Sequence, residues 1–260
     1  MYYKVIGKGK AVVLLHGFIE DGRLWGETAK ALSKKYKVIV PDLEGFGNTP
    51  LQAPQLSMNY YADEVHALLK KEKVKRCVML GHSMGGYVTL HFAEKYPQLL
   101  DGFGLVNSHC FADGDTKKIN RQKGNDFLRK HGTKPFVKEL YNSIFHPAFK
   151  AKQLPGGITG QQFINRLITQ AEQYTPESLI AANTAMMNRS GKEDVLKNAP
   201  VPVLMINGKQ DESAPYAATL QQASFPPFAD IHFYDDAKHM SLFEKKKETR
   251  LAIEQFLARI

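Results

Sequence analysis

The stretch VMLGHSMGGYVTLHFA, residues 78–93, decides the fold of this 260-residue chain. It begins with a short apolar run typical of a buried strand and continues with a helical pattern that lasts until Pro97. Ser83 lies between the two, with Gly81 and Gly85 two residues away on either side. A direct passage from strand to helix needs a sharp turn, and glycines allow close approach of the backbone because they lack Cβ atoms. The Gly-x-Ser-x-Gly pattern therefore predicts a nucleophile elbow that exposes the Ser83 hydroxyl.

Strand patterns and helical patterns alternate around this stretch. Apolar or β-branched runs typical of strands occur at 12–15, 38–40, 77–80, 104–107, 201–206 and 231–234, and helical patterns occur at 24–32, 60–69 and 84–96. Such alternation is typical of a parallel sheet with helices on both faces. We predict an α/β protein with a mostly parallel central sheet.

The alternation stops in the middle of the chain. Helical patterns occupy 136–145, 163–174 and 177–188, and no convincing strand lies among them. A segment of this length between two sheet strands is too long for a simple loop. We predict a helical cap at 109–199, inserted between a first part of the core at 1–108 and a second part at 200–260.

The end of the chain has a helical pattern with its own start signal. Ser241 and Glu244 have the spacing of a capping box, in which each side chain bonds the backbone of the other residue. The helix that follows places apolar residues on one face: Ile253, Phe256, Leu257 and Ile260.

A serine hydroxyl is a weak nucleophile until a base takes its proton and a third group orients that base. In this architecture the partners follow the serine in the order acid, then histidine. His239 follows the last predicted strand and precedes the final helix, so it is the predicted general base; His232 lies inside that strand. The alternative for Ser83 is a glycine-rich turn whose serine only caps the helix.

Two aspartates are candidates for the acid. Asp211 follows the strand at 201–206 after a turn at Gly208, which places it at the carboxyl end of the sheet, where open α/β folds bind ligands. Asp113, after the strand at 104–107, is the rival. Asp211 is the predicted member of the triad.

The same chemistry requires two N–H donors for the oxyanion. One is expected to be the backbone N–H of Met84, directly after the nucleophile, and the other that of Phe18, in the turn after the first long strand. His16 is expected to hold this turn by hydrogen bonds, and His82 to support the site from behind, both without a part in the chemistry.

These pieces resemble the α/β-hydrolase superfamily, and within it the cap-bearing serine esterases, the haloperoxidase-like perhydrolases and the acyl-carrier-ester hydrolases. The matching segments are 12–18, 41–47, 81–86, 202–211 and 238–239, in the order of the family and over nearly the whole chain. The resemblance implies cleavage of a small-molecule carboxylic ester, thioester or lactone through an acyl-enzyme, with no metal or organic cofactor. The chain departs from the family at Glu44, where a basic residue is common, and in the expected absence of the first strand of the sheet.

Other activities of this fold remain open. A dehalogenase would carry aspartate at position 83, where this chain has Ser83. A perhydrolase-type side activity would use the same residues as an esterase. A ligand-binding or signalling module of the same fold, with little turnover, is the alternative outside catalysis, and a complete triad argues against it.

The chain has a formal net charge of +9, and the excess concentrates in residues 109–199, with fourteen Lys and Arg against eight Asp and Glu. Either this segment attracts an anionic or carrier-linked substrate, or it is a solvated lysine-rich surface. The short run Lys245–Lys247 has no interleaved aromatic residues, so nucleic-acid binding is not expected.

The amino-acid composition narrows the class of protein further. With 43% hydrophobic and 23% charged residues, the chain is typical of a globular protein, and no apolar window is long enough for a membrane span. The two cysteines are Cys77 and Cys110, which exclude a disulfide scaffold and disfavour a zinc site. No signal peptide is recognised, so a cytoplasmic protein is expected. The oligomeric state cannot be predicted.

Overall fold

The computed structural model describes residues 1–260 and contains a seven-stranded sheet in the order β1-β3-β2-β4-β5-β8-β9. Six strands run parallel, and β1 pairs with β3 in the antiparallel direction. The strands are β1 (Tyr3–Ile6), β2 (Ala11–Leu15), β3 (Lys37–Pro41), β4 (Cys77–His82), β5 (Leu100–Val106), β8 (Val203–Gly208) and β9 (Ala229–Tyr234). The predicted α/β architecture is confirmed. The sheet edge that the sequence left open is occupied by β1, which the sequence did not predict.

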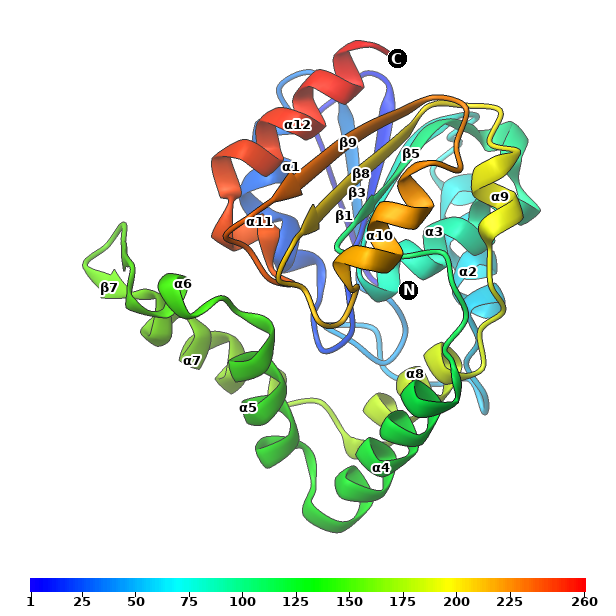
Figure 1. Ribbon diagram of the computed structural model, residues 1–260. Coiled ribbons are helices and arrows are strands. Elements are labelled where there is room, and N and C mark those ends of the chain that lie inside the picture. The colour runs from blue at the N-terminus through cyan, green and yellow to red at the C-terminus, as the bar shows by residue number, and fades with distance from the viewer.

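Helices cover both faces of the sheet because the central strands are buried on both sides. On β2, Val12 and Leu14 belong to one hydrophobic cluster, and Val13 and Leu15 belong to the other. The first cluster includes residues of α1 (Gly26–Leu32) and α12 (Lys246–Ala258), and the second includes residues of α2 (Met58–Lys71) and α3 (Met84–Lys95). Figure 1 shows these two pairs of helices on opposite sides of the sheet.

Between β5 and β8 the chain is mostly helical, and we refer to residues 109–199 as the helical segment. It contains α4 (Asp115–His131), α5 (Thr133–Ile144), α6 (Pro147–Ala151), α7 (Gly160–Ala171), α8 (Pro176–Met187) and α9 (Glu193–Lys197). Helices α4 and α8 pack together, as do α5 and α7, and they project beyond the end of the sheet toward which β8 and β9 point (Figure 1). A hairpin of two-residue strands, β6 (Gln153–Leu154) and β7 (Ile158–Thr159), turns at Gly156 and Gly157, so the expectation of no strand here is wrong.

The remaining helices include α10 (Tyr216–Ala223), the single turn α11 (Ser241–Glu244), and the 3-10 turns η1 (Gly22–Trp25) and η2 (Pro97–Leu99). No helix is both long and apolar enough to cross a bilayer.

The predicted capping box at Ser241 and Glu244 is wrong. The Ser241 hydroxyl donates to the Asn107 side chain, and the Glu244 carboxylate accepts the backbone N–H groups of His146 and Lys238. Both side chains therefore bond to other parts of the fold rather than to each other's backbone.

The predicted apolar face of the final helix is present. Ile253, Phe256 and Leu257 are buried against the sheet, and Ile260, just beyond the end of α12, packs against the same cluster. This face anchors the end of the chain to β8 and its neighbours.

Candidate active site

Ser83 lies at the turn between β4 and α3, and its backbone is strained. Its φ is +51°, in the region that favours glycine, and its ψ is −115°. The flanking glycines make this turn possible, because a Cβ on Gly81 would overlap the carbonyl oxygen of Gly85, and a Cβ on Gly85 would overlap that of Leu15. The sequence thus folds into a strand–turn–helix unit that presents a single hydroxyl.

The structure brings the three residues of the predicted triad together. His239 Nε2 lies 2.9 Å from Ser83 Oγ, and His239 Nδ1 lies 2.8 Å from Asp211 Oδ2. A carboxylate only accepts, so Nδ1 carries the hydrogen and Nε2 is free to accept the hydrogen of the Ser83 hydroxyl. The three residues follow the carboxyl ends of three strands, β4, β8 and β9.

The Asp211 carboxylate is held as an anion. Oδ1 accepts the backbone N–H groups of Ser213 and Ala214 at 2.8 and 2.9 Å, and Oδ2 accepts the Asn107 amide at 3.1 Å as well as the imidazole. Burial alone would raise the pKa of Asp211, but the charge and hydrogen bond of His239, together with these donors, lower it. The carboxylate is therefore ionised and can orient and stabilise an imidazolium.

Asn107, at the end of β5, is a member of the site that the sequence analysis missed. Its amide also donates to the carbonyl oxygen of Lys238 at 3.0 Å, and its own carbonyl accepts from the Ser241 hydroxyl. Asn107 has a φ of +49° and is fully buried. It joins the loop that carries Asp211 to the loop that carries His239. The available signal was its place at the carboxyl end of a buried strand.

Asp113, the rival acid, is engaged elsewhere. Its Oδ1 lies 2.7 Å from Arg189 Nη1, and its Oδ2 is bonded to Arg121 Nε. With both oxygens paired to guanidinium groups, Asp113 makes no hydrogen bond to His239. Of the two candidates, the structure brings only Asp211 to the imidazole.

The two predicted oxyanion donors have free N–H groups. Met84 is the first residue of α3, so its N–H has no acceptor within the helix, and the N–H of Phe18 donates to no other backbone group. The turn before Phe18 lies against Ser83, since a Cβ on Gly17 would come within 3.1 Å of the Ser83 Cβ. Both N–H groups are therefore free to bind an anionic oxygen.

His16 and His82 surround this site without contacting the Ser83 hydroxyl. His16 Nε2 accepts the N–H of Leu43 at 2.8 Å, and its Nδ1 lies 2.8 Å from the carbonyl oxygen of Gly17. Burial lowers the pKa of His16, so its ring is neutral and serves to hold the turn. His82 is bonded to Glu20 and to the carbonyl oxygen of His239.

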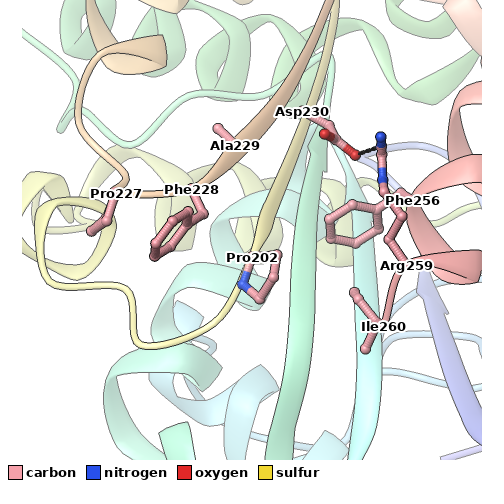
Figure 2. A pocket seen from close by; sticks show the side chains of 8 residues that line it. All are labelled: Pro202, Pro227, Phe228, Ala229, Asp230, Phe256, Arg259 and Ile260. Carbon is pink, nitrogen blue, oxygen red and sulfur yellow. Dashed lines mark hydrogen bonds and ion pairs between the residues drawn. The ribbon is translucent and has the colours of Figure 1, made fainter.

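A well-formed cavity lies elsewhere in the structure. It has a volume of about 380 Å³ and is formed at the amino ends of β8 and β9, near Pro202, Phe228 and Arg259 (Figure 2). Ser83, Asp211 and His239 follow the carboxyl ends of their strands, so this cavity lies at the opposite end of the sheet and takes no part in the site.

Comparison with known proteins shows the family of the chain. Residues 10–246 match the family model described as the alpha/beta hydrolase fold. The chain belongs to the α/β-hydrolase family. The resemblance expected from the sequence is confirmed.

Several relatives of this α/β hydrolase are esterases by name. The chain is 26% identical over 245 residues to a pimeloyl-[acyl-carrier protein] methyl ester esterase of Vibrio cholerae, covering 92% of this chain and 91% of the relative. A thermophilic esterase from Thermogutta terrifontis, solved with malate bound, superimposes with a TM-score of 0.91 at 26% identity, covering 99% of this chain and 93% of that one. An uncharacterized protein of Mycobacterium tuberculosis is 34% identical over 118 residues, which are 45% of this chain but only 33% of that relative. The chain thus spans about a third of that longer protein.

Proposed function

We propose that this α/β hydrolase is a serine hydrolase that cleaves a carboxylic ester of a small molecule through an acyl-enzyme. Ser83 is the nucleophile, His239 the general base and Asp211 the acid that orients it. The observation that supports this proposal is the unbroken chain of hydrogen bonds from the Ser83 hydroxyl through the imidazole to the buried carboxylate.

In the first half of the reaction, His239 Nε2 takes the hydroxyl proton while Ser83 Oγ attacks the ester carbonyl carbon. The electron pair of the carbonyl π bond moves to its oxygen, where the N–H groups of Phe18 and Met84 bind the negative charge. When the carbonyl re-forms, the bond to the alcohol oxygen breaks and His239 protonates that oxygen.

In the second half, water replaces the alcohol. His239 removes a proton from the water as its oxygen attacks the acyl carbon, and the proton then passes to Ser83 when the acid is released. A thioester or a lactone would react at the same carbonyl carbon by the same steps.

A reactivity assay separates this proposal from a ligand-binding module. A fluorophosphonate probe is expected to label the wild-type protein at Ser83, and p-nitrophenyl esters of increasing chain length are expected to be hydrolysed. The variant Ser83→Ala is expected to lose both reactions. Equal hydrolysis by wild type and variant, or no labelling of the wild type, would exclude the proposed function.

We further propose that the ester carries an anionic group that Lys117 binds. In the helical segment, Arg121 and Arg189 neutralise Asp113, whereas Lys117 forms no ion pair. Lys117 lies one turn before Arg121 on α4, so both side chains are on one face. Burial, followed by the charge of Arg121, lowers the pKa of Lys117. A carboxylate of the substrate would reduce the electrostatic repulsion between Lys117 and these arginines.

Arg189 of this cation cluster contacts the helix that follows Ser83. The Arg189 guanidinium lies 3.8 Å above the ring of Tyr87. Tyr87 lies one turn of α3 after Ser83, and the backbone N–H of Tyr87 donates to the Ser83 carbonyl oxygen at 3.3 Å. The name of the Vibrio cholerae relative and the malate held by the Thermogutta terrifontis esterase are consistent with acidic ligands in this family.

Matched substrates test the role of Lys117. Lys117→Met is expected to raise KM about tenfold for the p-nitrophenyl monoester of glutaric acid, a loss of about 1.4 kcal/mol, and to leave KM for p-nitrophenyl butyrate unchanged. Lys118→Met, at the exposed neighbouring lysine, is the control. For the wild type, the KM for the acidic ester is also expected to rise at high ionic strength, while the KM for p-nitrophenyl butyrate stays unchanged. Equal effects on both esters would contradict the proposal.

A further inference from the structure

His82, the residue before the nucleophile, is buried and bonded at both ring nitrogens. Nε2 lies 3.0 Å from the carbonyl oxygen of His239, which can only accept, so Nε2 carries a hydrogen. Nδ1 lies 2.9 Å from Oε2 of Glu20, whose side chain is also buried. The mechanism proposed above uses neither side chain, although the pair lies directly behind the Ser83 turn.

Glu20 also holds the turn that carries the Phe18 N–H. Its Oε2 accepts the N–H of Gly17 at 2.8 Å. Ile19, between Phe18 and Glu20, has a φ of +61°, which is rare for a β-branched residue and requires the surroundings to impose it. This strained turn is therefore anchored at Gly17 by the Glu20 carboxylate.

We propose that Glu20 and His82 form a carboxylate–imidazolium pair that positions the oxyanion-donor turn and the general-base loop on either side of Ser83. This inference rests on the proposed function. Through Glu20 the pair reaches Gly17 and thus the neighbouring Phe18 N–H, and through His82 Nε2 it reaches the backbone of His239. Because His82 is bonded covalently to Ser83, one pair of side chains fixes three separate chain segments.

The surrounding groups favour the charged form. The ionisable groups that face His82 are Glu20 and Asp211, with the His239 ring at 5.1 Å. Those that face Glu20 are His82, His16 and the buried phenol of Tyr141. Burial alone would lower the pKa of His82, but the charge and hydrogen bond of Glu20 raise it above its ordinary value. Burial would likewise raise the pKa of Glu20, and the charge of His82 and the Gly17 N–H lower it. The raised pKa of His82 and the lowered pKa of Glu20 both favour the charged pair, so the proton that the two side chains share resides on His82.

Nuclear magnetic resonance tests the charge directly. The full-length protein is labelled with ¹⁵N-histidine, and the ring signals of His82 are assigned by their loss in His82→Gln. We expect both ring nitrogens to remain protonated at about pH 8, above the ordinary histidine range. A His82 ring with one unprotonated nitrogen at pH 8 would overturn the proposal, since the pair would then be neutral.

Kinetics tests the positioning role. Glu20→Ala removes the acceptor of the Gly17 N–H, and we expect kcat to fall about a hundredfold, comparable to the loss of one oxyanion donor, with KM within about twofold of wild type. Glu20→Gln is expected to recover part of kcat, to a value between those of Glu20→Ala and wild type. Its amide oxygen, in the position of Oε2, can still accept the N–H of Gly17 but carries no charge to pair with His82.

Glu44→Gln is the matched control. Glu44 is a buried carboxylate that accepts the N–H groups of Gln52 and Ala53 and the Tyr60 hydroxyl, and it touches none of the groups around Ser83. We expect this variant to lose thermal stability but keep kcat. Equal losses of kcat in Glu20→Ala and Glu44→Gln, or a larger effect on KM than on kcat, would overturn the positioning role.

The two proposals fail in distinguishable ways. If the wild type shows no hydrolysis that depends on Ser83, the proposed function is wrong. The Glu20–His82 pair is then tested by the ring signals of His82 and by hydrogen exchange at the Gly17 amide. In that case Glu20→Gln, which keeps the fold, is expected to leave the Gly17 amide protected, and Glu20→Ala to expose it. Unchanged protection of Gly17 in Glu20→Ala would overturn the pair as an anchor.

Discussion

Two buried aspartates, Asp113 and Asp211, lie beyond the carboxyl ends of the neighbouring strands β5 and β8, yet their surroundings differ. Asp113 is paired with two guanidinium groups, which keep their charge at any accessible pH. Asp211 is bonded to neutral donors and to one imidazole, whose other nitrogen lies 2.9 Å from the Ser83 hydroxyl. Both carboxyl groups have lowered pKa values, so a lowered pKa alone does not mark a catalytic acid. The difference is that the imidazole beside Asp211 also contacts a serine hydroxyl.

The largest expected effect comes from neutralising the carboxylate beside the imidazole. In Asp211→Asn, the amide can donate to Nδ1, which would leave the hydrogen on Nε2 and deprive Ser83 of its base. We expect kcat to fall about 10⁴-fold, as for comparable triads, with little change in thermal stability. The measurement is p-nitrophenyl ester hydrolysis, with Asp235→Asn, at an exposed ion pair with Lys209, as control. Full activity in Asp211→Asn would exclude its assigned role.

The reverse pattern is expected for the other aspartate. Asp113→Asn leaves the guanidinium groups of Arg121 and Arg189 buried without their counter-charge, and we expect the free energy of unfolding to fall by about 3–5 kcal/mol. Urea denaturation measures this loss, and kcat of the folded variant is expected to stay within a few-fold of wild type. A loss of kcat as large as that of Asp211→Asn would erase the distinction between the two sites.

The smallest effect is expected in the pH dependence of stability. A carboxyl group whose pKa is lowered by folding stabilises the protein above its unfolded pKa, and this contribution is lost as the pH falls through the folded value. Asp113 and Asp211 both have lowered pKa values, so the melting temperature is expected to fall as the pH decreases below about 4. Asp113→Asn should flatten this decline. A melting temperature that rises on acidification would contradict the direction of both shifts.

The sequence predicted the parts of the site that depend on local pattern. Ser83 is marked by the glycines around it, and Asp211 and His239 by their positions after strands. Asn107 and Glu20 were missed because their partners lie far away in the chain: Asn107 bonds to Asp211 and Ser241, and Glu20 to His82. The same long-range bonding explains the error at Ser241, whose hydroxyl and local spacing fit a helix cap but whose buried acceptor is Asn107.

The edge strand and the hairpin were missed for a different reason. β1 is short and mostly exposed, so its residues lack the apolar run that marks the inner strands, and β6 and β7 have only two residues each. Strands of this kind depend on a neighbour already in place more than on their own composition. Periodicity therefore predicted the central sheet and not its margins.

Helix α5 of the helical segment is bonded to both halves of the site. The Tyr141 hydroxyl donates to the carbonyl oxygen of Ile19, and the carbonyl oxygen of Ile144, three residues later, accepts the N–H of His239. An outward swing of this helix would break both bonds at once, releasing the strained turn beside Phe18 and the loop that carries the imidazole. The strained turn beside Phe18 and the loop of His239 thus each take a hydrogen bond from the same helix, so the distance between these two loops depends on the position of α5.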